Sequence, residues 1–260
     1  MASGDHDRLL KLLGGAKTPT AEEFKELLVR LDSHRILAKV FLLEGTPFVF
    51  EQSPMKYVIF REQVADQFGI GSQDVCIVGS AKLGFSPSPH KYGTLFKDSS
   101  DVDVVIISEP LFDRGSRELF GVLNRLGPPV HELRSFLPPH TKEKAGARPI
   151  VDLGDWKDVK EAIRNFVFQN FNPGLLPPEH SLRREIFENI GSTAGLFLAL
   201  EPQVFVSKIR GRVFRTWKAA EDYYANTLRE AKRAFAGESV EAETEEGADP
   251  IVAKADAKGT

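Results

Sequence analysis

The sequence is poor in cysteine and contains no long apolar run. Its single cysteine, Cys76, excludes an internal disulfide, and its place in the apolar run 75–78 predicts a buried, unreactive thiol. No stretch reaches the ~20 apolar residues of a membrane span. The first residues, MASGDHD, lack the basic-then-apolar order of a signal peptide. These absences predict a cytoplasmic protein that is not inserted in a membrane.

A strong charge of either sign is also missing. The 260 residues carry a net charge of −3, and the segment 237–260 alone carries −5, from seven acidic residues and two lysines. The rest of the chain therefore carries +2, too little to indicate nucleic-acid binding from bulk charge. Because segment 237–260 also lacks aromatic residues, we expect a disordered acidic tail. The six histidines show no paired metal-ligand spacing, which argues against zinc.

The remaining composition, 42 % hydrophobic and 27 % charged, is typical of a globular protein with a sizeable core. Hydrophobic periodicity predicts interleaved strands and helices, and hence an α/β or α+β fold. The expected strands cover 75–78, 101–107 and 149–153, with an extended piece near 204–209. The expected helices cover 21–40, beginning at a capping box of Thr20 and Glu23, and then 54–68, 117–126, 156–167, 182–200 and 214–235. We expect an N-terminal helical segment (1–50), a core of strands and helices (51–180), a helical C-terminal region (181–236) and the tail.

Two acidic residues lead the second apolar strand. Asp101 and Asp103 are separated by one residue, so in a strand their carboxylates lie on the same face. Unpaired carboxylates beside an apolar run are unfavourable, which indicates a neutralising cation. Mg²⁺ fits, because it prefers carboxylate oxygens and keeps coordination positions for water and phosphate. Two solvated acids at a strand edge are the alternative reading.

The preceding strand ends at Gly79 and Ser80. Backbone N–H groups at such a turn, together with the Ser80 hydroxyl, form an anion-binding site suited to a polyphosphate. Lys82 would add a cation, and Ser100 directly precedes the acidic pair. An ordinary turn and a solvated lysine are the alternatives for this segment.

This arrangement, IVGS followed by SDVDVVI, resembles the catalytic core of the DNA polymerase β-like nucleotidyltransferase superfamily over residues 75–108. That superfamily has Gly-Ser at the end of one strand and an acid–apolar–acid pattern on the next. The resemblance implies a small mixed sheet flanked by helices, with segment 51–180 as the catalytic core. It further implies a nucleoside triphosphate bound with two divalent metal ions, Mg²⁺ or alternatively Mn²⁺. It also implies transfer of a nucleoside monophosphate to an acceptor, with release of pyrophosphate.

The resemblance assigns roles to individual residues. Gly79 and Ser80 match the residues that hold the triphosphate, with Lys82 and Ser100 as further nucleotide contacts, and Asp101 and Asp103 match the paired metal ligands. Two departures stand out. The insert 81–100 is longer than in compact members, and a third carboxylate has no unambiguous match; Asp152 is the first candidate and Glu132 the second.

The segment 208–218 concentrates five cationic and two aromatic residues. If it is extended, Lys208, Arg210 and Arg212 share one face, which would suit a triphosphate or a nucleic acid. The alternative is that Val213, Phe214 and Trp217 belong to the core and the cations reach into solvent.

The sequence thus predicts a Mg²⁺-dependent nucleotidyltransferase. The acceptor is open between a small molecule, a protein, RNA and a second nucleotide, and a toxin–antitoxin or defence setting is one that such relatives occupy. The alternative is a catalytically inactive protein of this fold that binds a nucleotide, a nucleic acid or a partner protein.

Overall fold

The computed structural model describes residues 18–97, 99–125, 156–201 and 208–236. These residues form a four-stranded mixed sheet flanked by helices, which confirms the expected mixed α/β class. The strands are β1 (Val75–Val78), β2 (Asp101–Ile107), β3 (Asn170–Phe171) and β4 (Lys208–Phe214). The helices are α2 (Ala21–Arg30), α3 (His34–Leu37), which continues as a π-helix (Ala38–Leu43), α4 (Pro54–Phe68), α5 (Ser80–Leu83), α6 (Glu109–Arg125), α8 (Trp156–Val167), α9 (Ser181–Leu200) and α10 (Trp217–Phe235).

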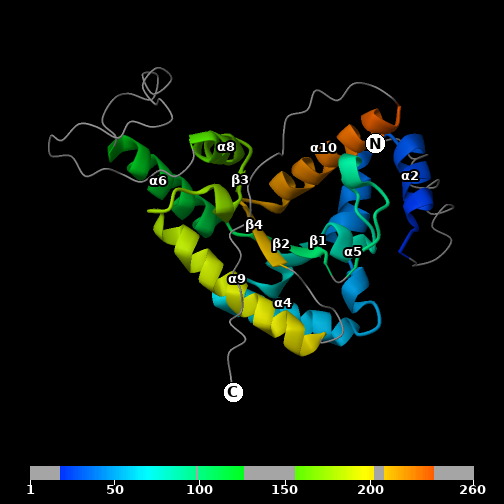
Figure 1. Ribbon diagram of the computed structural model, residues 1–260, viewed down its shortest axis with the longest axis horizontal. Coiled ribbons are helices and arrows are strands. Elements are labelled where there is room, and N and C mark those ends of the chain that lie inside the picture. The colour runs from blue at the N-terminus through cyan, green and yellow to red at the C-terminus, as the bar shows by residue number, and fades with distance from the viewer. Residues whose placement is uncertain (1–17, 98, 126–155, 202–207, 237–260) are drawn as a thin grey trace.

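The strand order across the sheet is β1-β2-β4-β3. β1 pairs antiparallel with β2, β2 pairs parallel with β4, and β4 pairs antiparallel with the short β3. The C-terminal region therefore contributes a strand beside β2, at the centre of the sheet (Figure 1). The extended piece expected near 204–209 is confirmed from Lys208, and it runs further, to Phe214.

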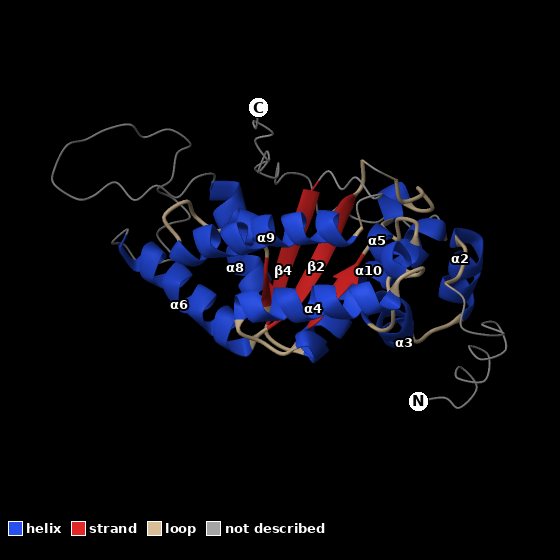
Figure 2. Cartoon of the chain, turned by 90° about the horizontal axis from the view of Figure 1, so that it is seen from below, coloured by secondary structure: helices blue, strands red, loops and turns tan. Residues whose placement is uncertain are grey.

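Helices cover both faces of the sheet. α4 and α9 pack on each other and on the strands across one face (Figure 2). Their core contains alternate strand residues, among them Ile77, Val102, Val104 and Ile106. α10 packs on the opposite face, where Val105 and Phe214 are buried with it. The sheet is thus a central layer with helices packed on both of its faces.

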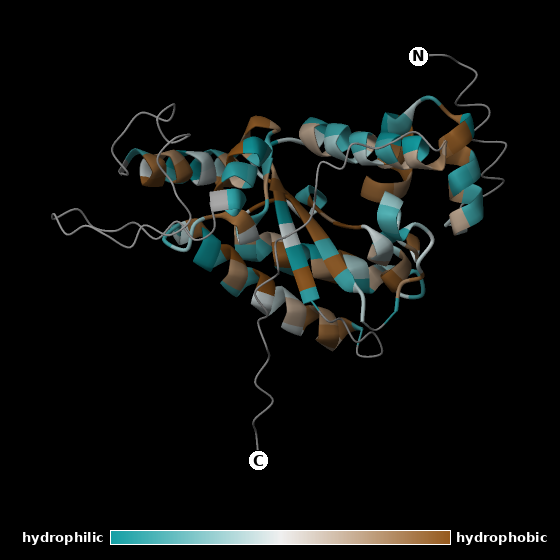
Figure 3. Ribbon diagram, turned by 45° about the horizontal axis from the view of Figure 1, so that its top comes forward, coloured by the Kyte–Doolittle hydropathy of each residue, from teal (hydrophilic) through white to brown (hydrophobic). Residues whose placement is uncertain are grey.

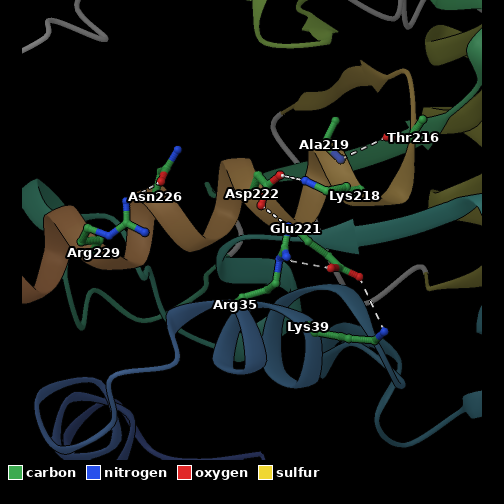
Figure 4. A network of polar contacts seen from close by, with 9 residues as sticks. All are labelled: Arg35, Lys39, Thr216, Lys218, Ala219, Glu221, Asp222, Asn226 and Arg229. Atoms are coloured by element: carbon green, nitrogen blue, oxygen red, sulfur yellow. Dashed lines mark hydrogen bonds and ion pairs between the residues drawn. The ribbon is translucent and has the colours of Figure 1, made fainter. Parts of the chain in front are cut away.

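The N-terminal helices form a second cluster with α10. The Thr20–Glu23 capping box is present, but a single helix over 21–40 is wrong: α2 ends at Arg30, and Leu31 is extended. Asp32 and Ser33 follow before α3 begins, and there the His34 N–H donates a hydrogen bond to the Asp32 carbonyl at 3.1 Å. Arg35 and Lys39 then form ion pairs with Glu221 of α10, at 3.5 and 3.6 Å (Figure 4).

Other boundaries follow the sequence signals. α4 ends at Gly69, whose φ of 62° is the left-handed conformation that ends many helices. α6 begins eight residues before the expected start, at Glu109, with Pro110 in its first turn and the Ser108 Oγ accepting a hydrogen bond from the Leu111 N–H.

The expected strand 149–153 and the tail 237–260 lie outside the described residues. None of the helices in the described ranges has the length and hydropathy of a membrane-spanning segment.

Candidate active site

The predicted acid pair and the Gly-Ser turn meet where β1 ends and β2 begins. Asp103 pairs with Val78 in the antiparallel ladder, and Gly79 follows Val78 directly. Gly79 has φ 69° and ψ −145°, a conformation that side-chain-bearing residues rarely adopt. A Cβ at this position would lie 2.9 Å from the Asp103 Oδ2. The backbone conformation therefore favours glycine, and a side chain at this position would have to displace the Asp103 carboxylate.

Ser80 and Ser100 flank this contact. Ser80 is the first residue of α5, which is one turn long and ends at Gly84, with φ 80°. Ser100 lies immediately before β2, where its Oγ accepts a hydrogen bond from the Lys97 N–H at 3.1 Å and its N–H donates to the Lys97 carbonyl at 2.7 Å. In this structure Ser100 therefore stabilises the turn that leads into β2.

Asp101 and Asp103 lie on the same face of β2, as their spacing predicts, while Val102 and Val104 are buried on the other. Two carboxylates from one strand form a hard oxygen donor set that fits a divalent cation such as Mg²⁺. Within the described ranges, no group of three or more His, Cys, Asp or Glu side chains is placed to hold a metal. Asp152 and Glu132 lie outside those ranges, so the proposed third carboxylate stays a prediction.

The neighbouring strand places cations beside the acids. In the parallel register Lys208 pairs with Asp101, and Arg210 pairs with Asp103. The Arg210 guanidinium forms an ion pair with the Asp101 carboxylate at 2.7 Å. We call Lys208, Arg210 and Arg212 the cationic row, since they occupy alternate positions on the α10 side of β4. The alternation of hydrophilic and hydrophobic residues along β4 is visible in Figure 3.

The inner end of the cationic row is held by side chains that the sequence analysis did not single out. The Arg212 guanidinium lies 4.7 Å from the centroid of the Tyr223 ring and donates a hydrogen bond to the Asn170 Oδ1 at 3.0 Å. Burial, with contributions from Tyr223 and the Asp103 carboxylate, raises the pKa of Tyr224 well above its usual value. The Tyr223–Tyr224 pair of α10 therefore borders the charged end of the sheet, although in the sequence it is simply part of a helix.

Lys82 is the predicted phosphate contact that the structure places elsewhere. It is 5 % exposed, and its Nζ donates hydrogen bonds to the Glu44 carbonyl and, at 2.8 Å, to the Gly45 carbonyl. Burial lowers the pKa of Lys82 to about 8. The ammonium group thus holds the backbone that follows the π-helix, which does not favour a role at the triphosphate.

Comparison of this chain with protein-family models, with curated proteins and with solved structures finds no match. A functional assignment therefore depends on the motif and on the geometry around Gly79, Asp101 and Asp103.

Proposed function

We propose that this protein is a Mg²⁺-dependent nucleotidyltransferase that transfers a nucleoside monophosphate from a nucleoside triphosphate to an acceptor and releases pyrophosphate. The observation that supports it is the contact between Gly79 and the Asp103 carboxylate across the β1–β2 ladder. This contact joins the two halves of the motif, a turn suited to phosphate and a pair of acids suited to a metal, which lie more than twenty residues apart in the sequence.

The acid pair and the Gly-Ser turn would have different roles in this reaction. Asp101 and Asp103 would hold the divalent cation, which supplies charge neutralisation on the phosphate oxygens. The N–H groups after Gly79, with the Ser80 hydroxyl, would bind and orient the triphosphate. The apolar residues behind β2 fix the strand, and with it the direction of both carboxylates.

The proposal is tested by incubating the purified protein with Mg²⁺ and each α-³²P-labelled nucleoside triphosphate, with cell extract as the acceptor source. We expect label transfer and pyrophosphate release from the wild type, and a loss of about 100-fold or more in Asp101→Asn and Asp103→Asn. Asp66→Asn, at an exposed acid of α4, is the matched control and should retain full transfer. Equal transfer by all three variants would contradict the proposal.

One observation favours a second candidate, a protein that binds nucleotides without transferring them. The Arg210 guanidinium is paired with Asp101, one of the two proposed metal ligands. An arginine keeps its proton at all working pH values, so this pair competes with a cation for the carboxylate. Nucleotide binding by equilibrium dialysis, with no label transfer to any component of the extract, would favour this candidate over the transferase.

A further inference from the structure

The nucleophile of the transfer reaction can be inferred from the strand beside the acid pair, and this inference rests on the proposed function. β4 adjoins β2 in a parallel register, and the residue opposite Asp103 is Arg210. β4 thus places the Arg210 guanidinium beside Asp101 and Asp103. The side chains there decide which acceptors can approach the α-phosphorus.

The orientation of β4 is fixed by packing. A Cβ at Gly211 would lie 2.4 Å from the Ile190 Cδ1 of α9, so β4 presses its backbone onto that helix. Val213, on the same side, is fully buried. Because strand side chains alternate, the cationic row is held on the opposite face, together with Asp101 and Asp103.

Cations and carboxylates at this position favour different nucleophiles. A carboxylate can accept the proton of an attacking hydroxyl, whereas a guanidinium has no free lone pair to accept one. A guanidinium does, however, stabilise an oxygen nucleophile that is already ionised. Among such groups, a phosphate monoester carries close to two negative charges at neutral pH and pairs with arginine through two parallel hydrogen bonds.

The two arginines differ in a way that suits ligand exchange. Arg212 is held by Tyr223 and Asn170, and is therefore oriented before a ligand arrives. The Arg210 side chain is 49 % exposed, and its ion pair with Asp101 is of the solvent-exposed kind that contributes little stability. A phosphate group can replace that carboxylate as the partner of Arg210, and this exchange would remove the competition of the guanidinium with a cation for Asp101.

We propose that the acceptor of this enzyme is a phosphate monoester, bound by the cationic row of β4. An oxygen of the acceptor phosphate attacks the α-phosphorus of the nucleoside triphosphate and forms a new P–O–P bond. The bond from the α-phosphorus to the bridging α,β-oxygen breaks, and pyrophosphate leaves with the electron pair. No proton has to be removed from the nucleophile, so the step requires no carboxylate base on β4.

The linkage in the labelled product is the first test. Extract labelled with the α-³²P-labelled nucleotide should contain a product from which nucleotide pyrophosphatase releases labelled nucleoside monophosphate, and alkaline phosphatase should remove no label. Defined probes then separate the sources: ribose 5-phosphate against ribose, and a 3′-blocked oligonucleotide with and without a 5′-phosphate. Transfer to either phosphorylated probe supports the proposal and identifies its source.

Label on hydroxyl acceptors, in a linkage that pyrophosphatase does not cleave, would overturn the phosphate acceptor and leave the transferase standing. The absence of transfer to every acceptor, extract included, would overturn both. These two failures are therefore distinguishable within one assay.

The role of the cationic row is tested by Arg210→Gln and Lys208→Gln, with Arg30→Gln of α2 as an exposed control. We expect the KM for the phosphorylated acceptor to rise about tenfold or more in the first two variants, and the KM for the nucleotide to change less than about twofold. Calorimetric titration with the phosphorylated acceptor should show the same loss of affinity without turnover. A rise confined to the nucleotide KM would assign the row to the triphosphate and overturn the proposal.

Discussion

The two faces of the sheet are built from alternate residues of the same strands, yet they differ in composition and in what covers them. On the α4–α9 face the strand residues are apolar along the whole length of β2, from Val102 to Ile106. On the α10 face only the far half is apolar, around Phe214, and the near half carries Asp101, Asp103 and the cationic row. One face therefore buries the strands against helices, whereas half of the other carries the charged side chains on which the proposed function depends.

The largest expected effect tests the apolar face. Ile106 is 1 % exposed, so Ile106→Ala should lower the free energy of unfolding by about 2–5 kcal/mol through lost burial and a cavity. Asp103→Asn, three residues earlier on the opposite face, should change it by less than about 1 kcal/mol while transfer is lost. Urea denaturation of both variants measures the two changes in the free energy of unfolding. Equal destabilisation would mean that both faces of β2 contribute alike to stability, which would contradict the comparison.

The apolar face is also the part of the fold that the sequence predicts best. The predicted strands 75–78 and 101–107 have the observed bounds of β1 and β2, because short apolar runs such as 75–78 and 104–107 are typical of strands covered on both sides. The contact of Gly79 with Asp103 is consistent with the motif, because in an antiparallel pair the end of β1 lies beside the start of β2.

The composition of the charged face could not be predicted in the same way. The pattern Lys-x-Arg-x-Arg shows that three cations share a side of an extended segment, but the pairing of β4 with β2 joins residues more than a hundred positions apart. No local pattern encodes such a partner. Lys82 is the opposite case: its position after Gly79-Ser80 indicates a phosphate ligand, and only the tertiary fold places the Glu44 and Gly45 carbonyls over its ammonium group.

The buried Lys82 offers the second prediction, which concerns pH. Burial lowers the pKa of Lys82 to about 8 in the folded protein, from the ordinary lysine value of 10.5. Between these values the unfolded chain binds more protons than the folded one, so stability rises with pH. The difference in the free energy of unfolding between wild type and Lys82→Met should therefore shift by up to about 3 kcal/mol in favour of the wild type from pH 8 to 10.5.

Groups that titrate in both proteins cancel in that difference. Lys91→Met, at an exposed lysine of the insert, should show no comparable rise. A flat difference for Lys82→Met would mean that the two carbonyl hydrogen bonds compensate the ammonium for its burial.

The third prediction separates backbone strain from the contact with Asp103. Gly79→Ala and Gly69→Ala both place a side chain at positive φ, but no atom lies within 4 Å of a Cβ at Gly69. We expect Gly69→Ala to lower the free energy of unfolding by about 1 kcal/mol and Gly79→Ala by about 2 kcal/mol. Only Gly79→Ala should also reduce label transfer, because its Cβ displaces the Asp103 carboxylate. Unchanged transfer in Gly79→Ala would show that the carboxylate does not need its place against Gly79.

The smallest effect is expected at the ion pairs between the N-terminal helices and α10 (Figure 4). Glu221 is 19 % exposed and forms ion pairs with Arg35 and Lys39, whereas the Glu26–Arg30 pair of α2 is a solvent-exposed pair one helical turn apart. Glu221→Gln should lower the free energy of unfolding by about 0.5–1 kcal/mol and Glu26→Gln by about 0.3 kcal/mol. Because 1 M salt shortens the screening length to about 3 Å, the difference between the two variants should shrink there. A salt-independent loss for Glu221→Gln would instead mean that this side chain stabilises α10 by packing, so that the attachment of the N-terminal helices is set by their apolar cluster alone.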